Sequence, residues 1–191
     1  MRKDYEYENF DIENFYMENL NNNSKLILIA SRLGVGKTSF AFNLIVEALK
    51  NNKKILINSL EMNGVEIFKK LDTDKNNYYL LNQNDAEIIL SEIEKVINKN
   101  SDVSLIVIDY LQLLDFSDID IETFAKNLKL IALKHNISIL ILSQLDREVE
   151  KRENKIPQQE DIRELKNLSD YIDLYVFLYK ENNKIKVKQI Y

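Results

Sequence analysis

Short apolar runs rich in β-branched residues alternate along this chain with longer stretches in which apolar residues recur at a helical spacing. Most of these runs are apolar nearly throughout, which predicts strands that are covered on both faces of a sheet. The predicted strands lie at residues 26–30, 54–58, 103–108, 138–142 and 174–178, with a more polar edge strand at 184–189 and a short one at 78–81. The helical spacing predicts helices at residues 38–50, 64–71, 85–98 and 122–135.

The alternation of strands and helices predicts an α/β domain with a mainly parallel central sheet and right-handed crossovers. The length of 191 residues fits one such domain, which we place at residues 23–191. Residues 1–22 are acidic, polar and aromatic, and we expect a short lead-in there rather than a domain. The one long, densely charged segment between predicted strands is residues 146–168, the best candidate for a functional loop.

The composition excludes several kinds of site. The chain has no Cys and one His, which excludes disulfides, thiolate metal sites, Cys nucleophiles and His-based metal clusters, and favours a reducing, cytoplasmic setting. No apolar run approaches the ~20 residues of a membrane helix, and the charged N-terminus lacks the features of a signal peptide, so we expect no membrane contact. The net charge of −5 argues against binding to nucleic acid through bulk charge, but not against a local basic site.

The scarcity of glycine draws attention to one turn. The chain has three Gly, and two of them, Gly34 and Gly36, lie two residues apart between the first predicted strand and the first predicted helix. A phosphate-binding loop needs backbone N–H groups turned toward one point, a helix N-terminus, a Lys for phosphate and a hydroxyl for Mg²⁺. Gly36, Lys37 and Thr38 meet these needs in the required order.

This turn therefore predicts a nucleotide-binding loop for ATP, although the strict pattern asks for Gly at the position of Ser31. The alternative is an ordinary Gly-containing turn before a helix. The candidate nucleotide-binding residues are Ser31, Arg32, Gly34, Val35, Gly36, Lys37, Thr38 and Ser39.

Three polar residues close or follow predicted strands, at the edge where an open parallel sheet binds ligands. Asp109 is a candidate for holding Mg²⁺ through a coordinated water, and the alternative is a cap for the next turn. Glu61 is a candidate general base for an attacking water, and the alternative is a carboxylate favoured by a helix N-terminus. Gln144 is a candidate sensor of a γ-phosphate, because an amide both donates and accepts hydrogen bonds.

Several blocks of sequence lie around these residues. They are Ser59-Leu60-Glu61-Met62, Ile108-Asp109-Tyr110-Leu111-Gln112-Leu113-Leu114, Leu142-Ser143-Gln144-Leu145-Asp146-Arg147, Asp161-Ile162-Arg163-Glu164 and Asp173-Leu174-Tyr175-Val176-Phe177-Leu178-Tyr179. In this order they resemble the ATPase domain of DnaB-type replicative helicases, within the RecA-like superfamily. The phosphate loop and the residues after it are also similar to that family, which tolerates a residue other than Gly at the position of Ser31. The resemblance runs from about residue 10 to residue 189.

The resemblance implies a RecA-like P-loop NTPase that binds ATP and Mg²⁺ and hydrolyses ATP. It implies that Lys37 and Thr38 bind phosphate and Mg²⁺ and that Asp109 holds the metal. It also implies that Glu61 activates the attacking water and that Gln144 couples the γ-phosphate to DNA-facing loops.

The segment after Gln144 is where such helicases place loops that line a channel for single-stranded DNA. The resemblance makes its basic side chains the candidate DNA contacts, to phosphate: Arg147, Lys151, Arg152, Lys155 and Arg163. Between Gln144 and Lys166, six basic side chains are accompanied by seven acidic ones, and no aromatic residue lies among them. A solvated charged face is therefore the alternative.

Three departures from the family bear on unwinding. DnaB-type helicases carry an N-terminal helical domain and a linker helix, whereas about twenty residues precede the ATPase core here, and the stretch from Glu61 to Asp109 is shorter than the family's. The family supplies an arginine finger from a Lys-Gln-Arg block on the final strand, where this chain reads Lys188-Gln189-Ile190. A missing finger costs ~10³–10⁵ in rate where one is used. Lys186 and Lys188 remain as weaker point-charge substitutes.

Two functions of different classes stay open. The first is a minimal helicase motor in DNA replication that forms a homo-oligomer, a hexameric ring, and moves on single-stranded DNA. The second is a nucleotide-dependent regulatory module that acts on a partner helicase without unwinding DNA. Glu61 and Gln144 favour the first, because a pure binder needs no water-activating Glu, whereas the missing finger and N-terminal domain favour the second. A small-molecule kinase would need an acceptor site and a lid, and the order of the blocks argues against it.

Overall fold

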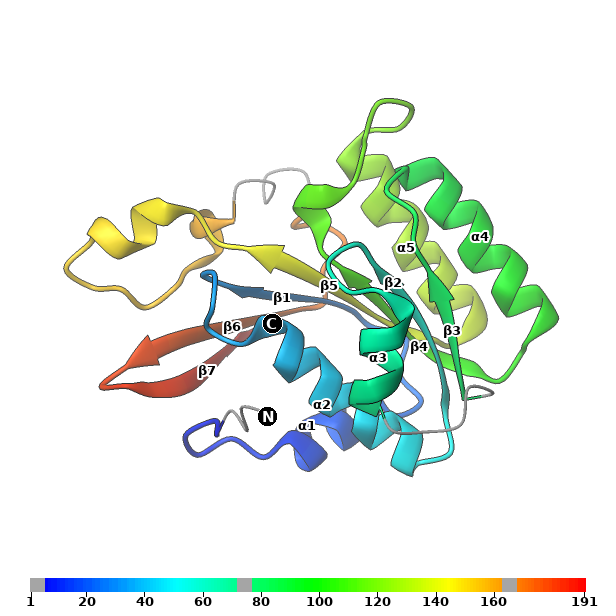
Figure 1. Ribbon diagram of the computed structural model, residues 1–191. Helices are drawn as coiled ribbons and strands as arrows, with labels where there is room; N and C mark the ends of the chain where they lie inside the picture. Colours follow the sequence, from blue (N-terminus) through cyan, green and yellow to red (C-terminus); the bar gives the residue numbers. More distant parts are fainter. Residues whose placement is uncertain (1–5, 72–76, 163–167) are drawn as a thin grey trace.

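A seven-stranded sheet forms the centre of the molecule. The computed structural model describes residues 6–71, 77–162 and 168–191. The strand order is β3-β2-β4-β5-β1-β6-β7, and every neighbouring pair is parallel except β6 with β7. The strands are β1 (Leu26–Ser31), β2 (Lys54–Ser59), β3 (Tyr78–Leu81), β4 (Val103–Asp109), β5 (Ser138–Gln144), β6 (Leu174–Glu181) and β7 (Lys184–Ile190) (Figure 1).

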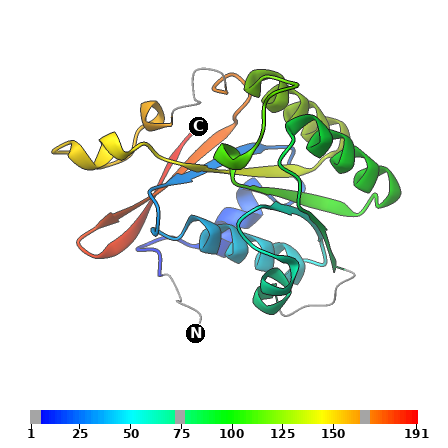
Figure 2. The same ribbon diagram turned by 45° about the horizontal axis from the view of Figure 1, so that its top comes forward.

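Helices cover both faces of this sheet. Figure 2 shows one group of helices below it and another above. The first group is α1 (Ile12–Asn19), α2 (Lys37–Lys50) and α3 (Gly64–Leu71), and the second is α4 (Ala86–Lys99) and α5 (Ile121–His135). Successive residues of a strand point to opposite faces, so in β1 Leu28 belongs to the part of the core on the α4 and α5 side, while Ile29 belongs to the part on the α1 and α2 side. Double coverage is why the inner strands are apolar nearly throughout.

The predicted α/β architecture is confirmed, and all predicted strands and helices are present within a few residues. Strands β1, β2, β4 and β5 run beyond their predicted ends by one or two residues, to Ser31, Ser59, Asp109 and Gln144, and β6 runs three residues beyond its predicted end, to Glu181. These added residues are polar, which is why the apolar pattern stopped before them. Helices α4 and α5 begin after Asp85 and Asp120, whose carboxylates accept hydrogen bonds from backbone N–H groups three residues on.

Helix α1 was not predicted. It is eight residues long and half of its residues are polar, so its periodicity is weak, but Phe15 and Tyr16 are buried against the α2 side of the core. The ring of Phe40 on α2 lies 6.1 Å from that of Phe15, 5.6 Å from that of Phe10 and 5.0 Å from that of Tyr7. Residues from the predicted lead-in therefore pack onto the outer side of α2, the helix that follows the phosphate loop.

The parallel strands bring their carboxyl ends to one edge. Ser31 is in register with Gln144, and Ser59 is in register with Asp109. The polar residues at the ends of β1, β2, β4 and β5 consequently face the same side of the molecule. No helix in the described ranges is long and apolar enough to cross a membrane.

We expect replacement of Phe15 by Ala to lower the free energy of unfolding by about 3–5 kcal/mol, as for other large aromatic residues removed from a core. Urea denaturation of the full chain measures this change. The matched control is Met17→Ala on the same helix, where the side chain is 47% exposed and the loss should stay within about 0.5 kcal/mol. Equal effects of the two variants would show that α1 does not contribute to the core.

Candidate nucleotide-binding site

The turn between β1 and α2 has the backbone of a phosphate loop. Gly34 has a φ of 74° and Gly36 a φ of 111°, both in the left-handed region that favours glycine. A Cβ on Gly34 would meet no heavy atom within 4 Å, so this position needs glycine for its backbone angle rather than for space. Gly36 is the N-cap of α2, and no side chain among the described residues caps that end. The first N–H groups of α2 are therefore available to an anion.

A hollow of about 220 Å³ opens beside this turn. It is lined by Ser31, Arg32, Leu33, Gly34, Gly36, Lys37, Thr38, Ser39, Glu61 and Gln144. The lining therefore brings most of the predicted nucleotide residues together with the predicted general base and the predicted sensor. Val35 is instead buried beneath the loop, in the part of the core under α2.

Lys37 is the basic residue at the base of the loop. Its ammonium lies 4.3 Å from the centre of the Tyr110 ring, within the range of a cation–π contact. Burial lowers the pKa of Lys37, and the charges of Asp109 and Glu61 oppose this shift. Burial, followed by the same two carboxylates, raises the pKa of Tyr110, so its phenol stays neutral at physiological pH. Tyr110 is not among the site residues that the sequence predicts.

Asp109 and Glu61 reach the loop from two neighbouring strands. Asp109 is the last residue of β4 and is 4% exposed. Glu61 is exposed on the turn after β2, and the N–H of Leu60 donates to the Asp109 carbonyl at 3.1 Å. This bond ties the turn carrying Glu61 to the strand carrying Asp109. Both carboxylates act on Lys37, so the predicted phosphate, metal and water-activating groups share one electrostatic environment.

Gln144, at the end of β5, is held by a second glutamine. The Gln112 amide donates to Ser143 Oγ at 2.9 Å and to the Gln144 carbonyl at 3.3 Å, and its oxygen accepts from the Gln144 N–H at 3.1 Å. Gln112 lies in the 3-10 helix η2 (Leu111–Leu113), directly after β4. Its positioning role was missed, although a lone polar residue in the apolar run from Leu111 to Leu114 is a signal that could have found it.

Comparison with known proteins gives the family of this chain. The family model described as "DnaB-like helicase C terminal domain" matches residues 15–97 and 74–190. The chain belongs to the DnaB-like helicase C-terminal domain family. Replicative DNA helicase DnaB of Buchnera aphidicola subsp. Baizongia pistaciae is 31% identical over 198 residues, which cover 83% of this chain and 43% of that protein. The chain thus spans less than half the length of this relative.

Two solved structures share the fold. One is an ATPase domain that aligns with a TM-score of 0.71 and 26% identity, covering 82% of this chain and 70% of that one. The other is a DnaB-like replicative helicase, solved in a study of its interactions with primase, which aligns with a TM-score of 0.71 and 25% identity over 84% of this chain and 48% of that one. The fold is RecA-like, and the chain is a replicative helicase-like ATPase domain.

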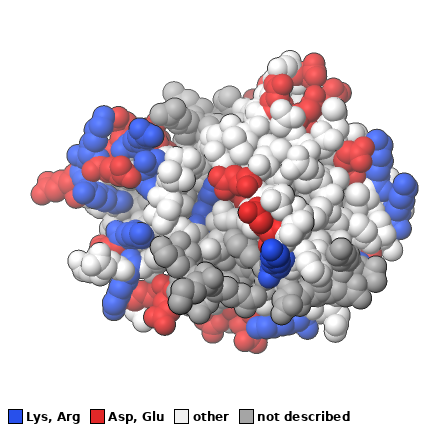
Figure 3. Space-filling view, in the orientation of Figure 1, with Lys and Arg blue, Asp and Glu red and all other residues white. Residues whose placement is uncertain are grey.

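The basic residues predicted to contact DNA follow β5 in this DnaB-like domain. They differ in whether their side chains form ion pairs within the chain. Arg152 Nη2 donates to Asp161 Oδ2 at 2.6 Å, and Lys151 pairs with Glu148 at 2.5 Å. Arg147 and Lys155 are exposed, and neither has an ion pair within 4 Å among the described residues. Arg163 lies outside the described residues. Figure 3 shows basic and acidic side chains intermixed at this end of the molecule, on the left of the view.

The two lysines considered as finger substitutes are engaged within this DnaB-like domain. Lys188 donates to the carbonyl of Pro157 at 2.9 Å. Lys186 pairs with Glu181 and, at 3.6 Å, with Glu8. Both lie on β7, the strand that closes one side of the sheet.

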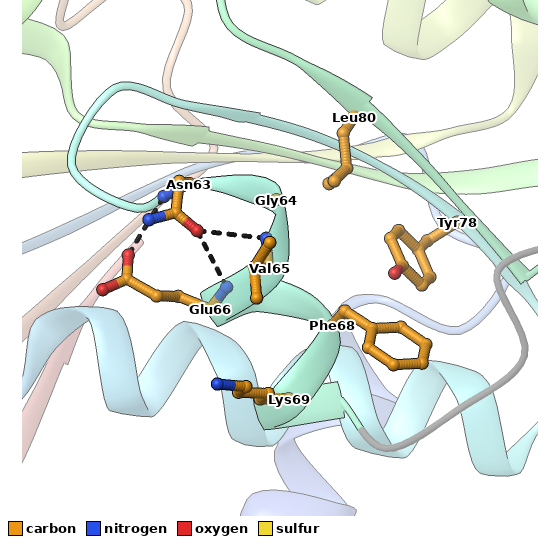
Figure 4. Close-up of a pocket in the computed structure, with 8 residues that line it drawn as sticks. All are labelled: Asn63, Gly64, Val65, Glu66, Phe68, Lys69, Tyr78 and Leu80. Carbon is orange, nitrogen blue, oxygen red and sulfur yellow. Dashed lines mark hydrogen bonds between the residues drawn. The ribbon is translucent and has the colours of Figure 1, made fainter.

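A larger hollow of about 1000 Å³ lies between α3 and β3, away from the phosphate loop (Figure 4). Its wall is mainly apolar, with Phe68, Tyr78 and Leu80 facing the space. The N-terminus of α3 beside it is already satisfied, because Asn63 Oδ1 accepts from two backbone N–H groups and Glu66 Oε2 accepts from the Asn63 N–H. The Val65 and Glu66 N–H groups at the start of α3 are therefore already used by Asn63, whereas no side chain among the described residues caps the start of α2 beside the smaller hollow.

We expect Lys37→Met to stabilise the nucleotide-free protein, because it removes a charge that burial disfavours. The midpoint of thermal unfolding should rise by roughly 2–4 °C, which corresponds to about 1 kcal/mol for a chain of this size. The pKa of Lys37 is lower in the folded than in the unfolded chain, so the charge costs stability below the folded pKa. That cost, and with it the gain from Met, should disappear as the pH rises toward 10.5, the ordinary value.

The matched control is Lys50→Met at the other end of α2. The carboxylate of Glu47 raises the pKa of Lys50 by a hydrogen bond and by its charge, so this substitution should bring no gain. A Lys37→Met protein that is less stable than wild type at neutral pH would contradict the burial of an unfavourable charge.

Proposed function

We propose that residues 23–191 bind ATP with Mg²⁺ at the phosphate loop and hydrolyse the γ-phosphate. The observation that carries this proposal is the hollow beside the loop, where uncapped N–H groups of α2 and the Lys37 ammonium meet the side chains of Glu61 and Gln144. Backbone donors and an ammonium bind phosphate, and a carboxylate and an amide can act on a water beside it.

The residues present fit Mg²⁺. No group of three or more His, Cys, Asp or Glu side chains able to hold a metal by itself occurs in the parts of the chain that are described. Mg²⁺ suits such a site because it usually takes one or two carboxylates together with substrate phosphates and waters. Thr38, through its hydroxyl, and Asp109, through a water, would hold the ion. When bound, Mg²⁺ would neutralise charge on the phosphates during their transfer.

Each side chain of this DnaB-like domain then has one task. Lys37 binds the terminal phosphates, and burial strengthens its attraction to them because fewer waters screen the charge. Glu61 accepts a proton from the attacking water, and its place on an exposed turn leaves a water room beside it. Gln144 contacts the γ-phosphate, and Gln112 fixes the backbone from which that amide projects.

We expect Glu61→Gln to keep ATP affinity and to lower turnover by about 10²–10⁴-fold, the usual contribution of a general base. Phosphate release at saturating ATP and direct titration with a nonhydrolysable ATP analogue measure the two quantities. Glu66→Gln is the matched control, because this exposed carboxylate caps α3 five residues further on and should leave turnover at the wild-type value. A fully active Glu61→Gln protein would remove the general-base role.

The same domain, as we further propose, acts on single-stranded DNA in replication. Its relatives are replicative DNA helicases by name, and the exposed basic side chains after β5 offer phosphate contacts. Arg152 contributes less to this surface than the sequence suggested, because Asp161 holds its guanidinium. The remaining candidates are Arg147, Lys151 and Lys155, with Arg163 outside the described residues.

Joint replacement of Arg147, Lys151 and Lys155 by Gln should reduce the salt dependence of single-stranded DNA binding. Three lost phosphate contacts lower the slope of log affinity against log salt by about 2, since each contact on a single strand contributes about 0.7. The control replaces three exposed lysines of α4 and α5, Lys95, Lys99 and Lys134, and should leave the slope unchanged. An unaltered slope in the first variant would place its residues on a solvated face.

A regulatory module that binds nucleotide and acts on a partner helicase is the second candidate function. The contacts of Lys186 and Lys188 favour this function. Both ammonium groups bind partners in their own chain, so neither is free to contact the nucleotide of a neighbouring subunit. Wild-type protein that binds ATP but no single-stranded DNA at any salt concentration would support the module over the motor.

A further inference from the structure

Two hollows share a wall made by Arg32 and Gln144. The first is the nucleotide hollow beside the phosphate loop. The second, of about 420 Å³, is lined by Arg32, Gln112, Gln144, Leu145, Asp146 and Arg147. Gln144 was predicted to connect these two sides. Arg32 offers a second connection, which begins inside the phosphate loop itself.

Arg32 bonds the phosphate loop to the residues that follow β5. Its Nε donates to Glu150 Oε1 at 2.8 Å, and its Nη1 donates to the Leu145 carbonyl at 2.7 Å. A backbone bond from the Leu145 N–H to the Ser31 carbonyl, at 3.0 Å, runs alongside. The Arg32 side chain is 15% exposed and that of Glu150 58%, so the guanidinium is the sheltered partner of the pair.

Hydrogen bonds hold residues 145–152, which we name the post-β5 segment, together as one unit. They contain the 3-10 helix η3 (Arg147–Lys151), in which Asp146 accepts from the Glu148 N–H and Val149 is buried. Asp161 holds the two ends of the segment, since its carbonyl accepts from the Asp146 N–H at 2.9 Å and its carboxylate accepts from Arg152. A displacement of Glu150 would therefore shift η3, with Arg147 and Lys151, as one body.

The charges around Glu150 make this contact sensitive to an anion. The hydrogen bond from Arg32 and then its charge hold the pKa of Glu150 below its ordinary value, and Arg147 and Lys155 act in the same direction. The carboxylate is thus ionised at neutral pH. Because Arg32 also lines the nucleotide hollow, a bound polyphosphate would compete with Glu150 for the same guanidinium.

We propose that the Arg32–Glu150 ion pair is a latch: it holds the post-β5 segment against the phosphate loop, and binding of nucleotide releases it. This inference rests on the proposed nucleotide site. It gives the coupling between bound nucleotide and the post-β5 segment to the side chains of Arg32 and Glu150, separately from Gln144. Linkage requires the effect to be reciprocal. If nucleotide weakens the latch, then a weakened latch raises the affinity for nucleotide by the same factor.

The test compares Glu150→Gln with wild type in two measurements made with a nonhydrolysable ATP analogue and Mg²⁺. In wild type, the analogue should speed hydrogen exchange of the backbone amides in residues 146–152. In Glu150→Gln, exchange should already be faster without nucleotide, by about two- to fivefold for one partly exposed ion pair, and should change little on binding. The affinity of Glu150→Gln for the analogue should be higher by the same two- to fivefold.

Glu148→Gln is the matched control, because Glu148 lies on the same short helix but pairs with Lys151 instead of the phosphate loop. It should behave as wild type in both measurements. If wild type binds the analogue, but Glu150→Gln has wild-type affinity and a wild-type exchange response, the proposed latch is refuted. The proposed nucleotide site is unaffected by that result. If wild type binds no nucleotide, the latch and the proposed function are both wrong.

Discussion

The parallel register of four inner strands is the constraint on which the rest of this structure depends. Strands β2, β4, β5 and β1 lie side by side, and each is buried along nearly its whole length. Because these strands are parallel and in register, they all end at the same edge of the sheet. The polar residues with which these strands end are thereby gathered at one place, although up to about 110 residues separate them in the sequence.

This constraint explains how much of the site could be predicted. The strand ends are visible because an apolar, β-branched run changes abruptly to Asp109 or Gln144, and the glycines of the phosphate loop are visible because the chain has so few. The register then brings these local signals together without any further information. Four of the inner strands were predicted one or two residues short, because the apolar pattern cannot include the polar residues that end them.

What the sequence could not supply depends on contacts between distant parts of the chain. Helix α1 has a weak pattern of its own and gains its stability from burying Phe15 and Tyr16 against the core. Arg32 and Glu150 are 118 residues apart, and only the pairing of β1 with β5 brings them together. The ion pair between Arg152 and Asp161 is likewise tertiary, and it weakens for Arg152 the expectation of DNA contact that the resemblance implied.

The proposed site gives this DnaB-like domain two connections from phosphate to the segment that carries its basic residues. One runs through Gln144, held by Gln112, and the other through Arg32 and Glu150. Both begin at the nucleotide hollow, so both depend on the proposed binding and hydrolysis of ATP there. The most direct measurement is steady-state phosphate release by the wild-type chain, with ATP and Mg²⁺ and again after chelation of the metal. We expect saturable release with Mg²⁺ that stops on chelation. Bound ATP that is never hydrolysed, or release that ignores the metal, would contradict the assignment of Glu61, Thr38 and Asp109.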